Sequence, residues 1–183
     1  MIESDEDFLI VTQIVRGEKE LFRLLVKRHE KAVYGMGMSF FHNTEDASDF
    51  VQEVFLKTFR FLAGFKGQSR FSTWLYKIAY NSAINSIARK KEYQSLADKE
   101  DLQENNTPER KALKNYVREA IMEAVKDLPE RFRICVDLFF FYDRSYKEIE
   151  GITQIPANTV KSHVFRAKKI LRQKLIDFEG FDP

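Results

Sequence analysis

The apolar residues of the chain recur mostly at the spacing of an α-helix. Residues 5 to 16 give one such stretch, and residues 18 to 41 give a second through Leu21, Leu24, Leu25, Val33 and Met36. Asn43 or Thr44 is placed to cap a third helix, whose apolar stripe is Ala47, Phe50, Val51, Val54, Thr58 and Leu62. Its opposite face carries Asp49, Gln52, Glu53 and Leu56. Two glycines in AGFKGQS break this helix, and residues 71 to 91 predict a long fourth one.

Residues 93 to 112 are polar, rich in acids and without apolar periodicity, which is typical of a linker. Helical patterns resume at residue 113, and Pro129 suits the first position of the helix ERFRICVDLFFFY, which is apolar enough to be buried on much of its surface. The pattern therefore predicts an all-α protein. Its two small helical domains are residues 1–92 and 113–179, joined by a flexible linker at 93–112.

The end of the chain has the pattern of a helix-turn-helix. Ser145 and Glu148 form a capping box that starts a short helix ending near Gly151, and a longer helix starts near Asn158. Val160, Val164, Ala167, Leu171 and Leu175 predict the inward stripe of the longer helix. Its outward face carries an aromatic residue among cations: Lys161, Ser162, Phe165, Arg166, Lys169 and Arg172. Phe165 either packs back onto the preceding helix or meets an apolar group such as a thymine methyl in a DNA major groove.

Charge is segregated along the chain, although the formal net charge is only +2. Residues 61–91 and 156–175 are both basic and free of acids, which is the electrostatic pattern of a nucleic-acid binder. A solvated charged face remains the alternative for either segment alone.

Other classes of function find little support in the sequence. The glycines form no phosphate-binding loop, and His29, His42, His163 and Cys135 lack the spacing of metal ligands, so we expect no enzyme, no cofactor and no metal. A single cysteine suits a reducing compartment. The acidic start and the lack of an apolar run of about 20 residues predict a cytoplasmic protein without membrane insertion.

Three motifs in order resemble those of an extracytoplasmic-function (ECF) sigma factor, the promoter-specificity subunit of bacterial RNA polymerase. They are DASDFVQEVFLKTF, FKGQSRFSTWLYKIAYNSAIN and the segment from LPERFRICV to FRAKKIL, and the resemblance covers nearly all of residues 7–175. It implies that the first segment binds core polymerase, the second opens and reads the −10 element, and the third reads the −35 element.

The resemblance also implies roles for individual residues. The side chains facing the β′ coiled coil of the polymerase would be Asp49, Gln52, Glu53 and Leu56. The loop and helix that capture single-stranded −10 DNA would use Phe65, Lys66, Ser69, Arg70, Phe71, Ser72, Thr73, Lys77 and Asn81. Phe71 and Trp74 could instead belong to the core. Lys77 stands where the family often has Arg, and so lacks the planar guanidinium.

The −35 element would be read by Lys161, Ser162, Phe165, Arg166 and Lys169, with His163 nearer the DNA backbone. Lys161 replaces a frequent Arg, and lysine lacks the planar guanidinium that reads guanine with two hydrogen bonds. The implied partners are core RNA polymerase through its β′ coiled coil and β flap, double- and single-stranded promoter DNA, and an anti-sigma factor. The alternative is a helix-turn-helix regulator of the response-regulator output type, which needs a phosphoacceptor βα domain.

Overall fold

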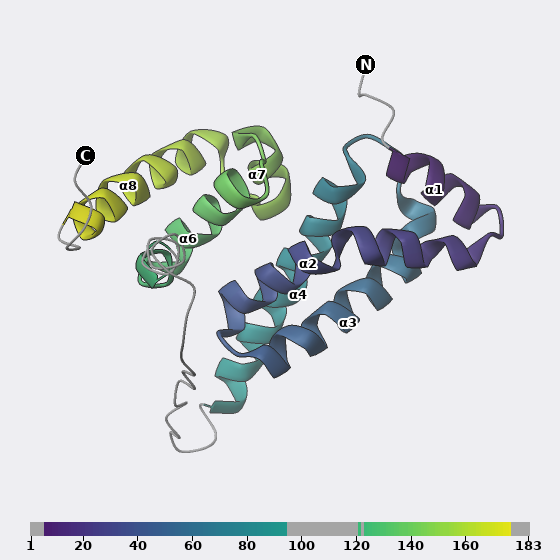
Figure 1. The fold of residues 1–183 in the computed structure, drawn as a ribbon, viewed down its shortest axis with the longest axis horizontal. Coiled ribbons are helices and arrows are strands. Elements are labelled where there is room, and N and C mark those ends of the chain that lie inside the picture. Colours follow the sequence, from purple (N-terminus) through teal and green to yellow (C-terminus); the bar gives the residue numbers. More distant parts are fainter. Residues whose placement is uncertain (1–5, 95–120, 122, 177–183) are drawn as a thin grey trace, which may run out of the picture.

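The computed structural model describes residues 6–94, 121 and 123–176, and these residues form helices and connecting turns without a β-strand. The predicted all-α class is confirmed. Figure 1 shows a group of helices α1 to α4 beside a second group, α6 to α8. Residues 93 and 94 of the predicted linker are the end of α4, and the rest of the linker lies outside the described residues. So does the start of the next predicted helix, residues 113–120.

The first group is a bundle of four α-helices. Its elements are α1 (Glu6–Val15), the 3₁₀ turn η1 (Lys19–Leu21), α2 (Phe22–Phe41), α3 (Thr44–Phe61), the 3₁₀ turn η2 (Leu62–Gly64) and α4 (Phe71–Gln94). Asn43 caps α3 as predicted, because its side-chain oxygen accepts a hydrogen bond from the backbone N–H of Asp46 at 2.7 Å. The chain can therefore reverse between α2 and α3 within two residues.

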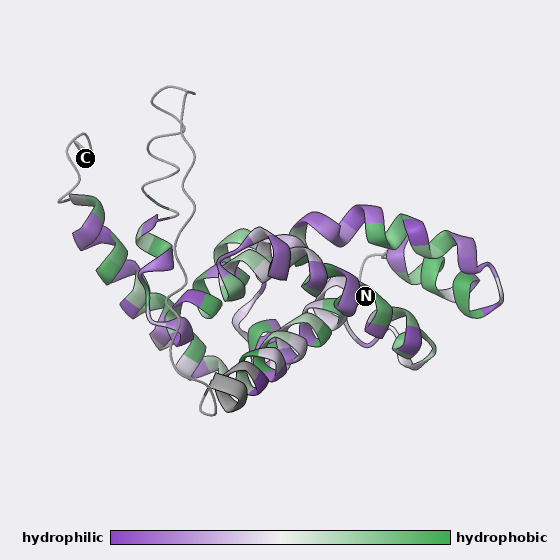
Figure 2. Cartoon of the chain, turned by 90° about the horizontal axis from the view of Figure 1, so that it is seen from below, coloured by the Kyte–Doolittle hydropathy of each residue, from purple (hydrophilic) through white to green (hydrophobic). Residues whose placement is uncertain are grey.

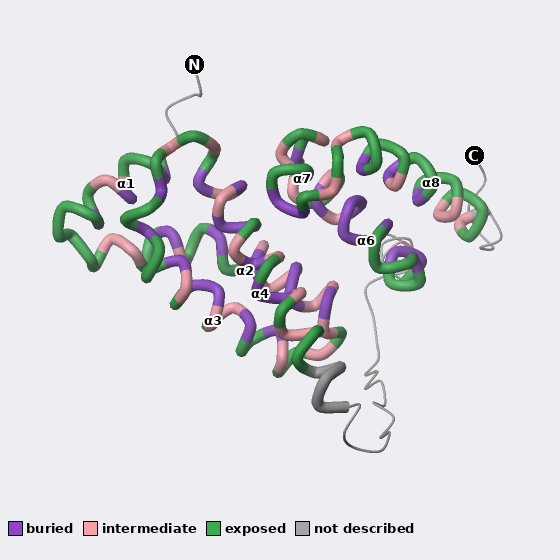
Figure 3. The backbone as a smooth tube through the Cα atoms, turned by 180° about the vertical axis from the view of Figure 1, so that it is seen from behind, coloured by how far each residue is buried: buried purple, intermediate pink, exposed green. Residues whose placement is uncertain are grey.

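The bundle buries the apolar stripes that the sequence predicts. Val54 and Thr58 of α3 are fully buried, and Figure 3 shows the buried positions of α2, α3 and α4 turned toward one another. The prediction for Leu24 is wrong, since this side chain is 40% exposed. Successive helical residues point about 100° apart, so Leu25 takes the place in the core and turns Leu24 to the surface. Apolar (green) and polar (purple) residues follow one another along each helix in Figure 2, as expected for helices with one buried side.

The second group begins with α6 (Glu130–Val136), where Pro129 is the N-cap, one position before the predicted place. The helix then widens into a π-helical segment, η3 (Asp137–Phe141), in which the N–H of Tyr142 reaches the carbonyl of Asp137. This register buries Leu138 but leaves Phe140 and Phe141 exposed, so the predicted burial of this helix holds only for its first part.

The predicted helix-turn-helix is present in α7 (Tyr146–Thr153) and α8 (Ala157–Ile176). Ser145 and Glu148 form the expected capping box at the start of α7. Gln154 ends α7 with a φ of 62°, which turns the chain toward α8. Val160, Val164 and Ala167 of α8 are buried, and Leu171 is half-buried.

The two groups pack against each other, and α7 lies on the first part of α4. Leu138, Ile149 and Ile152 belong to the same apolar cluster as the core of the first bundle. The hydroxyl of Tyr142 donates a hydrogen bond to the carbonyl of Ala32 at 3.0 Å. In the described part of the chain, no helix has the length and apolar content that crossing a membrane requires.

Candidate nucleic-acid interface

The outward face of α8 is the most open of the predicted surfaces. Lys161, Ser162, Phe165 and Arg166 surround a shallow hollow of about 410 Å³. The Phe165 ring is 71% exposed, so the alternative in which it packs back onto α7 is wrong. An aromatic ring held in water between two cations is unfavourable without a partner, and thymine methyl groups or sugar carbons offer one. Lys169 is exposed further along the helix.

His163 differs from its neighbours on α8 because its ring is half-buried between α8 and α6. Its Nδ1 lies 3.7 Å from the Cys135 sulfur, and its ring packs edge-on against Phe132 at 5.1 Å. Burial, followed by the positive charges of Arg131 and Arg166, lowers the pKa of His163. The ring thus packs in the contact between α8 and α6, and its predicted place near the DNA backbone stays a prediction.

The loop between η2 and α4 exposes cationic side chains, and aromatic side chains pack beneath them. Lys66 and Arg70 are exposed, and Ser69 is half-buried. Phe65 is buried and Phe71 is fully buried, with their rings edge to face at 5.6 Å. The core position that the sequence left open for Phe71 is therefore the one observed. In this arrangement the two rings support the loop and present no face to a base.

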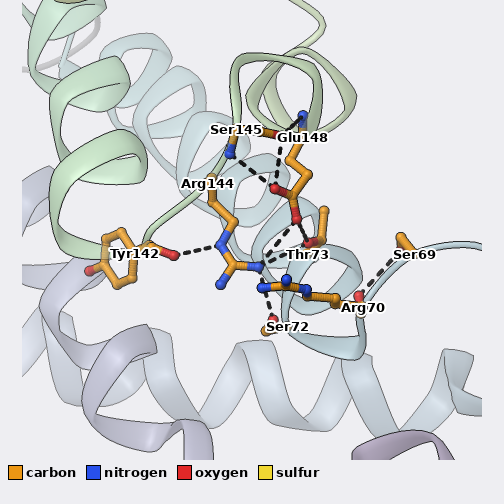
Figure 4. A network of polar contacts seen from close by, with 8 residues as sticks. All are labelled: Ser69, Arg70, Ser72, Thr73, Tyr142, Arg144, Ser145 and Glu148. Carbon is orange, nitrogen blue, oxygen red and sulfur yellow. Dashed lines mark hydrogen bonds and ion pairs between the residues drawn. The ribbon is translucent and has the colours of Figure 1, made fainter. Parts of the chain in front are cut away.

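Ser72 and Thr73, at the start of α4, are held by the second group of helices (Figure 4). The guanidinium of Arg144 donates to the Ser72 hydroxyl at 3.2 Å and to the Thr73 hydroxyl at 3.1 Å. Thr73 in turn donates to Glu148 at 2.8 Å, and Glu148 also completes the capping box of α7. Burial raises the pKa of Glu148, but hydrogen bonds from Ser145 and Thr73 outweigh this and lower it. Both hydroxyl groups are thus occupied within the chain.

Lys77 and Asn81 are exposed and lie one turn apart on α4, on the same face. A cation and an amide at this spacing can contact a phosphate and a base edge of one strand. Lys77 and Asn81 are therefore open to solvent, whereas the hydroxyl groups of Ser72 and Thr73 are held within the chain, and the DNA contacts of all four residues stay a prediction.

The outward face of α3 bears the residues expected to meet the polymerase. Asp49 and Gln52 are exposed, and Leu56 is 61% exposed. Glu53 is half-buried and pairs with Lys57 one turn later. The sequence pattern missed two further exposed aromatic residues near the end of this helix, Phe59 and Phe61. Both residues lie off the inward stripe of α3, as Leu56 does, and this position in the helical pattern could have predicted their exposure.

The contacts between the two groups of helices were also not predicted. The Ser39 hydroxyl donates to the carboxylate of Asp137, and burial raises the pKa of Asp137 to about 6. Tyr76 and Tyr142 pack edge to face at 5.1 Å, and the Arg144 guanidinium lies over the Tyr76 ring at 5.6 Å. These partners are far apart in the sequence, and no local pattern indicates that they meet.

Comparison with known families and structures assigns both groups of helices. Residues 25–93 match sigma-70 region 2, and residues 118–171 match sigma-70 region 4. The fold is similar to that of the sigma factor RpoE of Bartonella quintana, solved in complex with the anti-sigma factor NepR. The TM-score is 0.73 and the identity 20%, over 84% of this chain and 96% of that one. It is also similar to CnrH, solved in complex with the cytosolic domain of CnrY, with a TM-score of 0.66 and 20% identity over 94% and 97% of the two chains.

Curated relatives align along almost the whole sequence. The chain is 32% identical to the RNA polymerase sigma-H factor of Pseudomonas aeruginosa, in an alignment of 186 positions that covers 96% of each protein. It is 31% identical to the ECF RNA polymerase sigma-E factor of Escherichia coli K12, over 96% of this chain and 97% of the relative. The ECF RNA polymerase sigma-E factor of Haemophilus influenzae gives the same identity, over 96% and 98%. With regions 2 and 4 in the expected order, the chain belongs to the ECF family of RNA polymerase sigma factors.

Proposed function

We propose that this sigma factor binds core RNA polymerase through the outward face of α3. Asp49 and Gln52 offer a carboxylate and an amide to basic and polar partners, and Leu56 adds an exposed apolar contact. The β′ coiled coil is the partner that the family resemblance implies for this face, and the β flap is a further polymerase contact that it implies. Catalysis belongs to the polymerase.

The second part of the proposal is that α8 reads the −35 element. The observation that carries it is the Phe165 ring, 71% exposed in a hollow bordered by Lys161 and Arg166. Cations at the rim can bind phosphates and guanine edges while the ring meets a thymine methyl. A response-regulator output domain would use such a helix too, but it needs a βα receiver, and the described N-terminal half consists of helices.

The third part is that the loop after η2 and the exposed face of α4 capture the −10 element as single strands. Lys66, Arg70 and Lys77 supply positive charge along one path, and Asn81 supplies a group able to read a base edge. Phe65 and Phe71 stiffen the loop from below.

The packing of the two domains affects whether the loop after η2 and the start of α4 can bind the −10 element. Arg144 and Glu148 bind Ser72 and Thr73, so the packed arrangement of the two domains occupies part of the surface proposed for DNA. We infer that this is the closed form of the free protein and that the domains separate on core polymerase. An anti-sigma factor would bind the closed or the open form and thereby control whether this surface can bind DNA. The complex of the similar RpoE with NepR supports such a role.

One experiment tests the proposed function as a whole. Core polymerase is loaded with this chain and crosslinked to genomic fragments, and the bound DNA is sequenced. We expect a shared pair of short elements, roughly 20 to 25 base pairs apart, which is about 70 to 80 Å along the duplex. Core polymerase loaded with the Arg166→Ala variant is the control, and it should lose enrichment of the upstream element only. Fragments that share no element would contradict the proposal.

A further inference from the structure

Helix α1 lies before the segment that matches sigma-70 region 2, yet it contacts the loop proposed to capture the −10 element. Two consecutive residues of α1, Asp7 and Phe8, reach the loop from different sides. Asp7 acts through α2 and the buried ring of Phe71, whereas Phe8 lies directly on the loop. The helix is thus joined to the loop by two separate routes.

The first route is a buried hydrogen-bonded contact between Asp7 and His29. The Asp7 side chain is almost fully buried, and one of its oxygens lies 2.7 Å from Nε2 of His29. Its other oxygen accepts a hydrogen bond from Arg28, which also pairs with Glu6 at 3.0 Å. Burial raises the pKa of Asp7, but the hydrogen bond and charge of His29, together with Arg28, outweigh it and keep the pKa below its ordinary value. Asp7 therefore fixes the position of the imidazole ring of His29.

The His29 ring continues this route to the loop. Its centroid lies 5.4 Å from that of Phe71, the first residue of α4. Phe71 packs edge to face on Phe65 at 5.6 Å, and Phe65 packs on Trp74 at 5.3 Å. Aromatic pairs of this geometry hold rings in defined orientations. The position of α1 is in this way transmitted to both ends of the loop.

The second route is direct. Phe8 is 42% exposed, and its ring lies edge-on against Phe65 at 6.2 Å and covers Gly67. Gly67 has a φ of +68°, which favours glycine, and a Cβ at this residue would lie 2.6 Å from the Phe8 ring. Ring and glycine therefore fit each other, and the turn at the tip of the loop forms against Phe8.

We propose that α1 is a positioning element for −10 recognition, in which Phe8 and the Asp7–His29 pair hold the loop of residues 65–70 in the shape that receives a single-stranded base. This inference rests on the proposed function of the loop and extends it to a helix outside the matched regions. Phe8 acts through Phe65 and Gly67, so it is a positioning residue and makes no DNA contact of its own. The alternative is that α1 only stabilises the bundle.

The test uses holoenzyme at a promoter found by the crosslinking experiment, with permanganate reactivity of the −10 thymines as readout. Phe8→Ala should reduce this reactivity by roughly 2- to 12-fold, the effect of losing one aromatic pair. It should also weaken discrimination between the natural −10 sequence and single-base variants, which a loss of stability alone would not change. Affinity for core polymerase and protection of the −35 element should stay unchanged. Phe8→Tyr keeps the ring and should retain both the permanganate reactivity and the −10 discrimination of the wild type.

A double substitution separates positioning from simple stabilisation. Gly67→Ala should impair melting more in the wild-type background than in the Phe8→Ala background. In the wild-type background the new Cβ clashes with the Phe8 ring, whereas in the Phe8→Ala background only the backbone strain remains. If Phe8→Ala folds poorly by circular dichroism, Phe8→Leu takes its place in this double-mutant cycle. Additive effects of the Phe8 and Gly67 substitutions on melting would overturn the inference.

The control Asn81→Ala distinguishes this inference from the proposed function. Impaired melting by Asn81→Ala together with normal melting and normal −10 discrimination by Phe8→Ala overturns the inference and leaves the function standing. Normal melting by both variants overturns both.

Discussion

Removing the Arg144 side chain should open the free protein. Arg144 is only 9% exposed and makes two hydrogen bonds across the domain contact, to Ser72 and to Thr73. A hydrogen bond from a charged donor contributes about 1.5 to 3 kcal/mol, and both of these are longer than 3.0 Å and are donated by the same nitrogen of Arg144. A loss of about 2 kcal/mol for the pair is therefore reasonable, and it corresponds to a shift of roughly 30-fold in the ratio of open to closed forms.

The ratio can be measured by the distance between two spin labels, one at Arg60 in the first domain and one at Arg172 in the second. Cysteines introduced at these exposed positions take the label, whereas Cys135 is fully buried and burial raises its pKa to about 11. The wild type should give one distance, that of the closed form. Arg144→Ala should add a second population at other distances, which core polymerase increases further in both proteins.

Two controls support this experiment. Arg23→Ala removes an exposed arginine at the far end of α2 and should leave the distances unchanged. Thr73→Val removes the partner hydroxyl, and combining it with Arg144→Ala should cost less than the sum of the two single changes, because they share one interaction. Identical distance distributions in Arg144→Ala and the wild type would refute the role of this contact.

Three further predictions concern the charged groups of the two domains. Because burial raises the pKa of Asp137 from 3.8 to about 6, the closed form binds this proton more tightly than an open form with the ordinary pKa. Lowering the pH from 7.5 to 5 should thus favour the spin-label distance of the closed form by about 1 kcal/mol, and Asp137→Asn should abolish this dependence. Asp49→Lys combined with Glu53→Lys should prevent co-elution with core polymerase while circular dichroism stays unchanged, since neither side chain belongs to the core; undiminished co-elution contradicts the assignment of α3. Arg166→Ala should weaken binding at promoters with a −35 element by about 1 to 3 kcal/mol and have little effect on a pre-melted −10 template; equal losses on both would contradict its role.

Local sequence patterns were sufficient for the features that depend on neighbouring residues. The stripe of α3, the Asn43 cap and the Ser145–Glu148 capping box each involve residues within one or a few turns of a helix, and all are present. The same is true of the exposed cations of α8, because a helix that buries Val160 and Val164 must turn Lys161 outward.

What the sequence could not predict depends on tertiary contacts. Arg144 and Thr73 are separated by 71 positions, and nothing near either residue indicates that they meet. The burial of Phe71 likewise depends on Phe65 and His29, which come from a loop and from another helix. At the π-helical segment η3, Leu138 is buried and Phe139 stacks on Tyr146 at 4.9 Å, and helical periodicity alone contains neither contact. The residue-level assignment of DNA contacts remains a prediction for the same reason.

The central claim is that this chain gives core polymerase promoter-specific initiation, with α4 opening the −10 element. The most direct measurement is transcription in vitro from a crosslinked promoter on linear DNA, together with permanganate mapping of the −10 thymines. We predict that core polymerase alone makes no specific transcript, that the wild-type chain yields one start site with reactive −10 thymines, and that Asn81→Ala retains promoter binding but loses the reactivity. Transcription that does not depend on the chain, or full −10 opening by Asn81→Ala, would contradict it.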